Sequence, residues 1–255
     1  MDWLLLRGLS REQRHWGAFP DILRQKLPGA TLHFLDLPGA GTEAHRPSPV
    51  TVRGIMEDVR ARWLPLRAAN KGPWGLLAMS LGGMVAMQWC ADHPGDWARV
   101  ALANTSAANV GRPWDRMSPR AVFTVVRVMF ERDPVARERR VLSLVTRRRR
   151  DLDIVARQWA AIQRERPVSR LNVVRQLRAA TVFRAPERLS VPALLLAGGR
   201  DVLASPACAR ALASRFGAPL HVEPESGHEL SLDAPDWLAE RLGAWEGQML
   251  AGVAT

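Results

Sequence analysis

Hydrophobic positions along the chain follow two alternating patterns. Short uninterrupted apolar runs predict buried strands at residues 3–6, 31–35, 74–79, 100–103, 193–197 and 220–222. Between most of these runs, apolar residues recur every three or four positions, which predicts helices at residues 13–27, 51–66, 81–93, 206–216 and 236–250. Non-alternating apolar strands interleaved with helices are typical of a parallel sheet covered on both faces. The pattern therefore predicts an α/β fold.

The stretch from residue 107 to residue 190 interrupts this alternation, because it contains several helical patterns and no clear strand. Ser118-Pro119 and Asp133-Pro134 each combine a capping side chain with proline at the first helical position, which predicts two helix starts. Two further helices are expected from Asp151 and from Ser169. We therefore expect a core of residues 1–106 and 186–255 and an all-helical insertion of residues 107–185.

Composition limits the kind of protein. The 255 residues are 47% hydrophobic and 24% charged, which is usual for a globular chain and excludes a disordered or collagen-like one. No apolar run reaches the roughly 18 residues of a membrane span, and the first residues lack the basic start of a secretory signal. Cys90 and Cys208 match no metal-ligand spacing, so we expect two reduced, buried thiols in a cytoplasmic protein.

The net charge of +11 is concentrated in the insertion. Residues 107–190 hold 20 arginines against eight acidic residues, a net of +12, whereas the rest of the chain has a net of −1. A basic insertion on a neutral body suggests a local anionic partner, while nucleic-acid binding would be indicated by a chain that is basic throughout. An arginine-rich, solvated helical face is the alternative.

The segment from Leu76 to Gly83 carries the clearest chemical signal. Ser80 stands at the joint between a predicted strand and a predicted helix, and the small residues Ala78, Gly82 and Gly83 surround it. Such a sharp turn exposes the serine hydroxyl and leaves no room for large neighbouring side chains. The N–H groups at the start of the helix also favour an oxyanion. The pattern predicts a nucleophilic serine, and an ordinary serine N-cap before helix-packing glycines is the alternative.

A serine hydroxyl needs a base to act as a nucleophile. Asp201 follows the predicted strand at residues 193–197, and His228 follows the one at residues 220–222. Both loops open at the same carboxyl edge of the sheet as Ser80, and the chain order Ser, Asp, His is typical of one family of hydrolases. Taken singly, the alternatives are an aspartate that caps the next helix and a surface histidine. Together, the three residues predict a catalytic triad.

Backbone amides that could bind an oxyanion are also predicted. Leu81, directly after the nucleophile, should supply one, and Leu9 should supply the second, because Gly8 allows the loop after the first strand to turn. An ordinary glycine turn is the alternative for Gly8. Asp36 also follows a strand, but its Asp-Leu-Pro-Gly setting is typical of a structural turn.

An acyl pocket should lie beside these groups. Trp16 and Met79 are candidates because they neighbour the Gly8 loop and the nucleophile. The other candidates are apolar residues of the insertion, namely Val122, Phe123, Val126, Met129 and Phe130. Packing of the insertion on the core is the alternative for all of them.

Taken together, these motifs resemble the α/β-hydrolase family. The resemblance covers nearly the whole chain and rests on Arg7-Gly8 with Trp16, Asp36 to Gly41, the turn at Ser80, Gly199-Arg200-Asp201 and Gly227-His228. It implies a mostly parallel sheet of about six strands, the family's first two being missing, with helices on both faces and the insertion as a lid over the active site. Arg7 stands where these enzymes commonly carry histidine.

Within the family, the chain is similar to small microbial carboxylesterases, which include the pimeloyl-acyl-carrier-protein methyl ester esterases. This implies cleavage of small or medium acyl esters through an acyl-enzyme, with no metal or organic cofactor, His228 as base and Asp201 orienting it. Hydrolysis of esters or thioesters on an acidic acyl-carrier protein, lactonase activity, perhydrolase activity and an inactive receptor or scaffold are the alternatives. No nucleic acid is expected, and the oligomeric state is left open.

Overall fold

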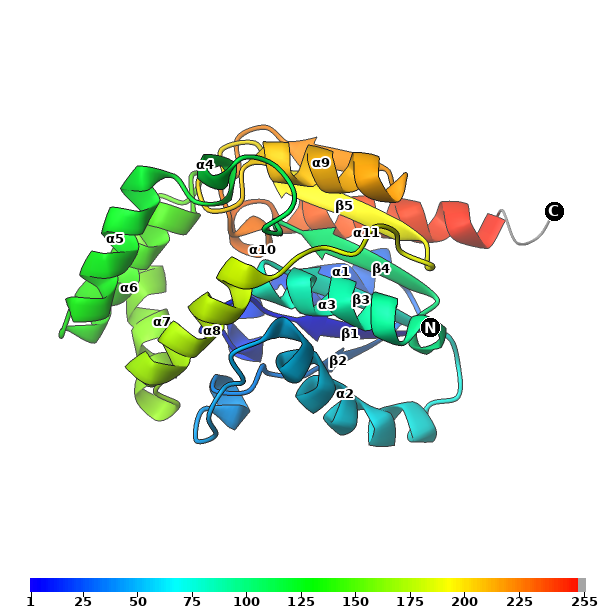
Figure 1. Ribbon diagram of the computed structural model, residues 1–255, viewed down its shortest axis with the longest axis horizontal. Coiled ribbons are helices and arrows are strands. Elements are labelled where there is room, and N and C mark those ends of the chain that lie inside the picture. Colours follow the sequence, from blue (N-terminus) through cyan, green and yellow to red (C-terminus); the bar gives the residue numbers. More distant parts are fainter. Residues whose placement is uncertain (252–255) are drawn as a thin grey trace.

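The computed structural model describes residues 1–251, the side chains of Arg120, Leu250 and Ala251 excepted. Its centre is a sheet of six parallel strands in the order β2-β1-β3-β4-β5-β6 (Figure 1). The strands are β1 (Asp2–Leu6), β2 (Thr31–Phe34), β3 (Trp74–Met79), β4 (Arg99–Ala103), β5 (Ala193–Gly198) and β6 (Leu220–Glu223). The predicted α/β fold with a six-stranded parallel sheet is thus confirmed.

Helices cover both faces of the sheet. Leu4 and Leu6 pack on one face and Trp3 and Leu5 on the other, because successive side chains of a strand point in opposite directions. The first face is covered by α2 (Val52–Ala69), α3 (Leu81–Asp92) and α9 (Pro206–Phe216), and the second by α1 (Phe19–Lys26) and α11 (Pro235–Ala251). Burial on both faces is why the central strands β3 and β5 are apolar at every position, whereas the edge strands β2 and β6 are only partly buried and carry polar residues.

One predicted helix is wrong in its extent. The structure divides residues 13–27 into a 3-10 helix, η1 (Gln13–Trp16), and α1, which begins only at Phe19. Gly17 lies between them at φ 56°, a left-handed conformation that interrupts a helix, and Pro20 in the first turn starts the next one. Through this turn the chain passes from the carboxyl edge of the sheet to the sheet face that α1 covers.

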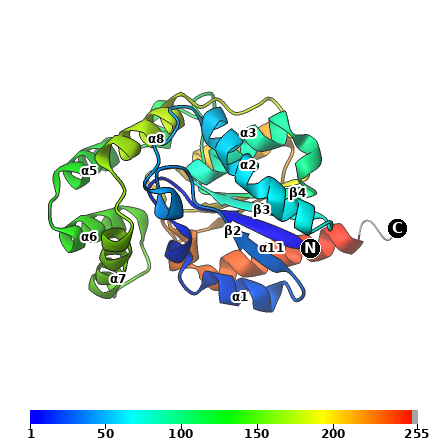
Figure 2. The ribbon, with the colours of Figure 1, turned by 90° about the horizontal axis from the view of Figure 1, so that it is seen from below.

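Five helices between β4 and β5 form what we call the lid: α4 (Pro113–Arg116), α5 (Pro119–Phe130), α6 (Pro134–Val145), α7 (Leu152–Glu165) and α8 (Arg170–Val182). Figure 2 shows α5, α6, α7 and α8 at one end of the molecule, opposite the C-terminus and beyond the carboxyl ends of the strands. Ser118, Asp133 and Ser169 accept hydrogen bonds from first-turn amides, as predicted. The lid also has its own small core, centred on Leu142 and Trp159.

None of the helices within residues 1–251 is long and apolar enough to cross a membrane.

Candidate active site

Ser80 lies at a strained turn between β3 and α3. Its backbone has φ 54° and ψ −119°, a conformation that non-glycine residues rarely adopt. The turn is held by β4, because Ser80 N–H donates to Ala103 O (2.9 Å) and the Thr105 hydroxyl donates to Ser80 O (2.8 Å). A Cβ atom at Gly82 would lie 2.5 Å from Arg7 O, so the start of α3 approaches the neighbouring backbone as closely as glycine allows.

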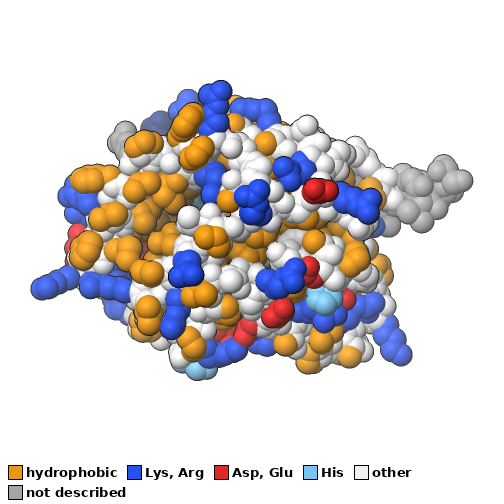
Figure 3. Space-filling view, viewed as in Figure 1, with side chains coloured by type: hydrophobic (Ala, Val, Ile, Leu, Met, Phe, Trp, Pro, Cys, Tyr) orange, Lys and Arg blue, Asp and Glu red, His pale blue; other side chains and the backbone are white. Residues whose placement is uncertain are grey.

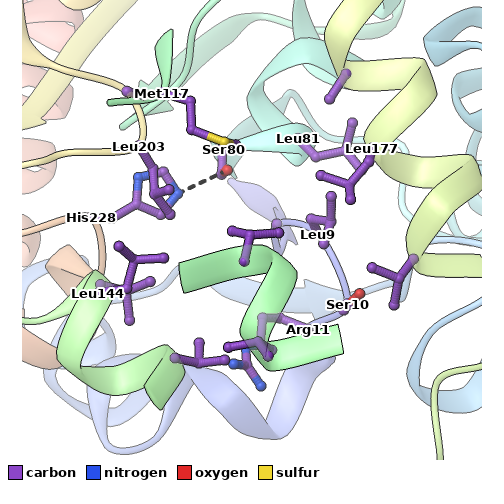
Figure 4. Close-up of a pocket in the computed structure, with 18 of the residues that line it drawn as sticks. Leu9, Ser10, Arg11, Ser80, Leu81, Met117, Leu144, Leu177, Leu203 and His228 are labelled. Carbon is purple, nitrogen blue, oxygen red and sulfur yellow. Dashed lines mark hydrogen bonds between the residues drawn. The ribbon is translucent and has the colours of Figure 1, made fainter. Parts of the chain in front are cut away.

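His228 joins Ser80 to Asp201 in a continuous chain of hydrogen bonds. His228 Nε2 lies 2.9 Å from Ser80 Oγ (Figure 4), and on the other side of the ring His228 Nδ1 lies 2.7 Å from Asp201 Oδ2. The other Asp201 oxygen accepts the backbone amides of Leu203 (2.7 Å) and Ala204 (3.0 Å), which fixes the carboxylate. The structure thus brings together three residues that come from three different loops at the carboxyl edge of the sheet.

The loops that carry Asp201 and His228 are held by Asn104, which the sequence analysis missed. The Asn104 side chain donates to His228 O (2.6 Å) and Gly227 O (3.2 Å), and it accepts from Gly198 N–H (2.8 Å). Its own φ of 46° is a left-handed conformation that asparagine tolerates better than most residues. An asparagine directly after a buried strand is the only local signal of this role.

The electrostatic setting of His228 favours its protonated form. Burial lowers the pKa of this imidazole, but the Asp201 carboxylate, with a smaller contribution from Glu229, more than offsets burial and raises the pKa above its ordinary value. Arg7 acts in the opposite direction. The histidine is therefore placed to accept a proton from Ser80 and to hold it as an imidazolium beside the carboxylate.

Leu9 and Leu81 both lie on the side of Ser80 that faces away from His228 (Figure 4). Leu81 is the first residue of α3, where a backbone N–H has no acceptor within the helix. The Gly8 loop packs directly on the nucleophile, because a Cβ atom at Gly8 would lie 2.9 Å from Ser80 Cβ. The two residues predicted to donate to an oxyanion thus belong to segments that adjoin Ser80.

Two lid glutamines hold the Gly8 loop in place, and neither was singled out from the sequence. Ser10, at φ 57°, donates its backbone N–H to Gln176 Oε1 (2.9 Å), and Ser10 O accepts from Gln163 Nε2 (3.3 Å). Gln176 is fully buried and also donates to Pro38 O (3.1 Å). The lid is therefore hydrogen-bonded to the loop that carries Leu9.

A cavity of about 570 Å³ opens in front of Ser80, within the usual size range of ligand sites. Met79, Val122 and Met129 line it, as predicted from the sequence. Most of the other apolar lining residues belong to the lid: Pro113, Met117, Val125, Val128, Val141, Leu144, Val145, Val168, Val173, Leu177 and Ala180. Leu9, Leu81, Met84, Leu203 and Ala204 line it from the core. The lining is mostly hydrocarbon, and the cavity offers an apolar channel next to the hydroxyl.

Four residues predicted to line the pocket lie elsewhere. Trp16 is buried against Phe19 and beneath the Arg7 guanidinium, on the core side of the Gly8 loop. Phe123, Val126 and Phe130 are on the outer face of α5, where Phe123 and Phe130 are 63% and 73% exposed. The helical spacing of the apolar residues in α5 was correct, but it does not show which side of the helix faces the cavity.

Asp36 has the structural role predicted for it. Its carboxylate accepts the backbone amides of Gln13 (2.8 Å) and Thr42 (2.9 Å), and burial raises its pKa. Cys90 and Cys208 are free, buried thiols. Among residues 1–251, no three His, Cys, Asp or Glu side chains are grouped as metal ligands would be.

Comparisons with known proteins agree with this fold. A family model described as "Serine aminopeptidase, S33" matches residues 13–235, and the chain therefore belongs to this family of α/β-hydrolases. The chain is 31% identical over 252 residues to the pimeloyl-[acyl-carrier protein] methyl ester esterase of Aromatoleum aromaticum, covering 92% of this chain and 94% of the relative. The enzyme of the same name from Chromobacterium violaceum is 28% identical over 222 residues, covering 84% and 83%.

A solved structure of an esterase from Exiguobacterium antarcticum superimposes with a TM-score of 0.78 at 16% identity, covering 96% of this chain and 91% of that one. The chain is thus a hydrolase of the α/β-hydrolase fold, related to microbial esterases.

Proposed function

We propose that the protein is a carboxylesterase that cleaves small or medium acyl esters, with Ser80, His228 and Asp201 as its catalytic triad. The observation that carries this proposal is the hydrogen-bonded chain from Ser80 Oγ through His228 to Asp201, which faces the apolar cavity. A nucleophile, a base and an orienting acid at such distances are the arrangement that acyl transfer requires.

The reaction proceeds in two steps. Ser80 Oγ attacks the ester carbonyl carbon while His228 Nε2 takes the hydroxyl proton, and Asp201 stabilises the resulting imidazolium. The tetrahedral intermediate expels the alcohol, which receives the proton from His228. A water molecule, deprotonated by the same histidine, then attacks the acyl-enzyme; the bond from the acyl carbon to Ser80 Oγ breaks, Oγ takes the proton back from His228, and the acid leaves.

The negative oxygen of each tetrahedral intermediate needs donors that are already in place. The Leu9 and Leu81 amides serve this role in the proposal, because both residues lie on the side of Ser80 away from His228 and Leu81 lies at the positive end of α3. The acyl chain occupies the cavity next to Met79 and Met129, whose walls are mostly hydrocarbon. The ester group of the substrate thus lies next to the triad, while its acyl chain is removed from water.

Replacing the nucleophile tests the proposal. Ser80→Ala should lower turnover of a p-nitrophenyl ester by on the order of 10⁴-fold or more, and a serine-directed phosphonate should add one label per chain to the wild type and none to the variant. Ser143→Ala, at an exposed serine of α6, is the matched control and should keep full activity. Labelling at another residue, or an active Ser80→Ala variant, would exclude Ser80 as the nucleophile.

A substrate carried by an acidic acyl-carrier protein is the second candidate. Two observations favour it: the names of the relatives, and the charge of the lid. Figure 3 shows Lys and Arg side chains spread over the lid face among hydrophobic ones. Arg157, Arg164, Arg170 and Arg178 are exposed lid residues, and no carboxylate among the described residues pairs with them. Such guanidinium groups can bind carboxylates and phosphates in pairs of hydrogen bonds.

A panel of p-nitrophenyl esters of increasing chain length, lactones and acyl-carrier-protein methyl esters, assayed side by side, separates the two candidates. Preferred turnover of free esters supports a general carboxylesterase, and preferred turnover of the carrier-bound ester supports the second candidate. Lactones test whether the same triad acts as a lactonase.

A further inference from the structure

Arg7 and Glu229 form a buried ion pair beside the proposed triad. Arg7 Nη2 lies 2.7 Å from Glu229 Oε2 and Arg7 Nη1 lies 2.9 Å from Glu229 Oε1, so the pair is bidentate. Ser231 Oγ accepts from Arg7 Nη1 (3.2 Å) and donates to Glu229 Oε1 (2.8 Å). The guanidinium also stacks over the ring of Trp16, 4.6 Å from its centre. Both side chains are almost completely removed from solvent.

The pair connects three segments that the proposed reaction needs. Arg7 directly precedes Gly8 and Leu9, and its Nη1 lies 3.3 Å from the sulfur of Met79, the residue before the nucleophile. Glu229 directly follows His228. One ion pair therefore joins the loop of the oxyanion donor, the nucleophile turn and the histidine loop.

Stability alone is a weak reason for such a pair. Removing two charges from water is costly, and well-packed apolar residues of similar size are often as stable or more stable in the same place. What an apolar pair lacks is directed hydrogen bonds and a field at the neighbouring imidazole. We propose that Arg7 and Glu229 are positioning residues of the esterase, which hold the Leu9 and His228 loops against Ser80 and balance each other's charge at His228. This inference rests on the proposed function of Ser80 and His228.

The charged groups around His228 determine how its pKa should change in variants of Arg7 and Glu229. Three charged groups act on it most: Asp201 and Glu229 raise its pKa, and Arg7 lowers it. From the other packed elements, Asp233 of α10 (Leu230–Asp233) accepts the Gly227 N–H (2.7 Å), and the Arg147 side chain lies against Gly227.

His15 lies near Arg7 on its other side. Burial, and then Arg11 and Arg7, hold the pKa of His15 well below its ordinary value. The neutral form of His15 is thus favoured, so the titration of interest is that of His228.

The test is the pH profile of kcat/KM for a small neutral ester, whose acidic limb reports the free-enzyme pKa of His228. In Glu229→Gln, Arg7 stays charged because an arginine does not lose its proton in this range. The imidazolium is then destabilised, and the acidic limb should move to lower pH by about half a unit or more. The double variant Arg7→Gln/Glu229→Gln removes both charges, so its limb should return toward that of the wild type.

Charge-preserving variants test positioning separately. Arg7→Lys and Glu229→Asp keep the charges but lose the bidentate geometry, so kcat should fall at least about tenfold while the limb stays in place. The matched control is Glu246→Gln, which breaks the similarly buried Arg99–Glu246 pair (2.7 Å) and should lower the melting temperature without moving the limb. These variants also provide the test if Glu229→Gln does not fold.

The outcomes are distinguishable. An unshifted limb in folded Glu229→Gln, or an unchanged kcat in both Arg7→Lys and Glu229→Asp, would overturn the inference and leave the esterase proposal intact. An active Ser80→Ala variant assayed in parallel would instead overturn the proposed function on which the inference rests.

Discussion

Replacing Asp201 by asparagine should abolish most activity without unfolding the protein. In the structure, Asp201 Oδ1 accepts the Leu203 and Ala204 amides, and Oδ2 faces His228 Nδ1. Two buried amides without an acceptor would be costly, so the asparagine carbonyl oxygen should stay with them. The side-chain NH₂ must then face His228 and donate to Nδ1. The imidazole is forced to carry its proton on Nε2, where it cannot take the proton of Ser80.

The size of the loss follows from this change of tautomer. A triad held in the wrong tautomer typically loses about 10⁴-fold in kcat, which corresponds to about 5.4 kcal/mol of transition-state stabilisation. KM should change little, because Asp201 does not line the cavity. The melting temperature should stay within a few degrees, because both backbone hydrogen bonds remain.

The assay is steady-state hydrolysis of a p-nitrophenyl ester, with thermal unfolding measured on the same samples. Asp36→Asn is the matched control, because Asp36 is another buried carboxylate that accepts two backbone amides after a strand but does not contact His228. It should keep its activity. If Asp201→Asn retained more than a tenth of wild-type turnover while folded, the tautomer argument would fail and another acid would have to orient His228.

Three further predictions follow from the site. Because the pKa of His228 is raised, the acidic limb of the wild-type pH profile of kcat/KM should lie above pH 6.5, and activity should be lost as the pH falls through it. An acidic limb below pH 6.5 would contradict the balance of charges around His228. Met129→Ala should shift the ester chain-length preference toward longer chains, because Met129 lines the cavity. Phe123→Ala, on the outer face of α5, should leave that preference unchanged. Equal effects of the two variants would mean that a different face of α5 lines the cavity. If an acidic carrier protein docks on the lid, turnover of the carrier-bound ester should fall steeply between roughly 0.05 and 0.5 M salt, because the Debye length falls below about 5 Å. Turnover of a neutral small ester should not change over that range. Equal salt responses of the two substrates would exclude docking of an acidic carrier.

Local sequence was sufficient for the sheet and for the positions of Ser80, Asp201 and His228 at its edge. The inner strands β1, β3, β4 and β5 are largely buried, so their apolar runs stand out, and parallel strands place their carboxyl ends at one edge. Ser80 directly follows β3, and Asp201 and His228 lie in the loops after β5 and β6, so their meeting at that edge could be predicted from the order of the elements. The lid helices were also predictable, because Ser118, Asp133 and Ser169 cap them locally.

Only the tertiary structure shows which residues from distant elements contact one another. Arg7 and Glu229 are 222 positions apart, and nothing near either residue in the chain shows that they pair. The same holds for Gln176, which reaches Ser10 from the lid, and for Phe123, whose helix is amphipathic but turns that side chain to solvent. The physical reason is that helical spacing and strand burial are set by a residue's near neighbours, whereas the partner of a buried charge and the side of a helix that faces a cavity depend on how distant elements pack.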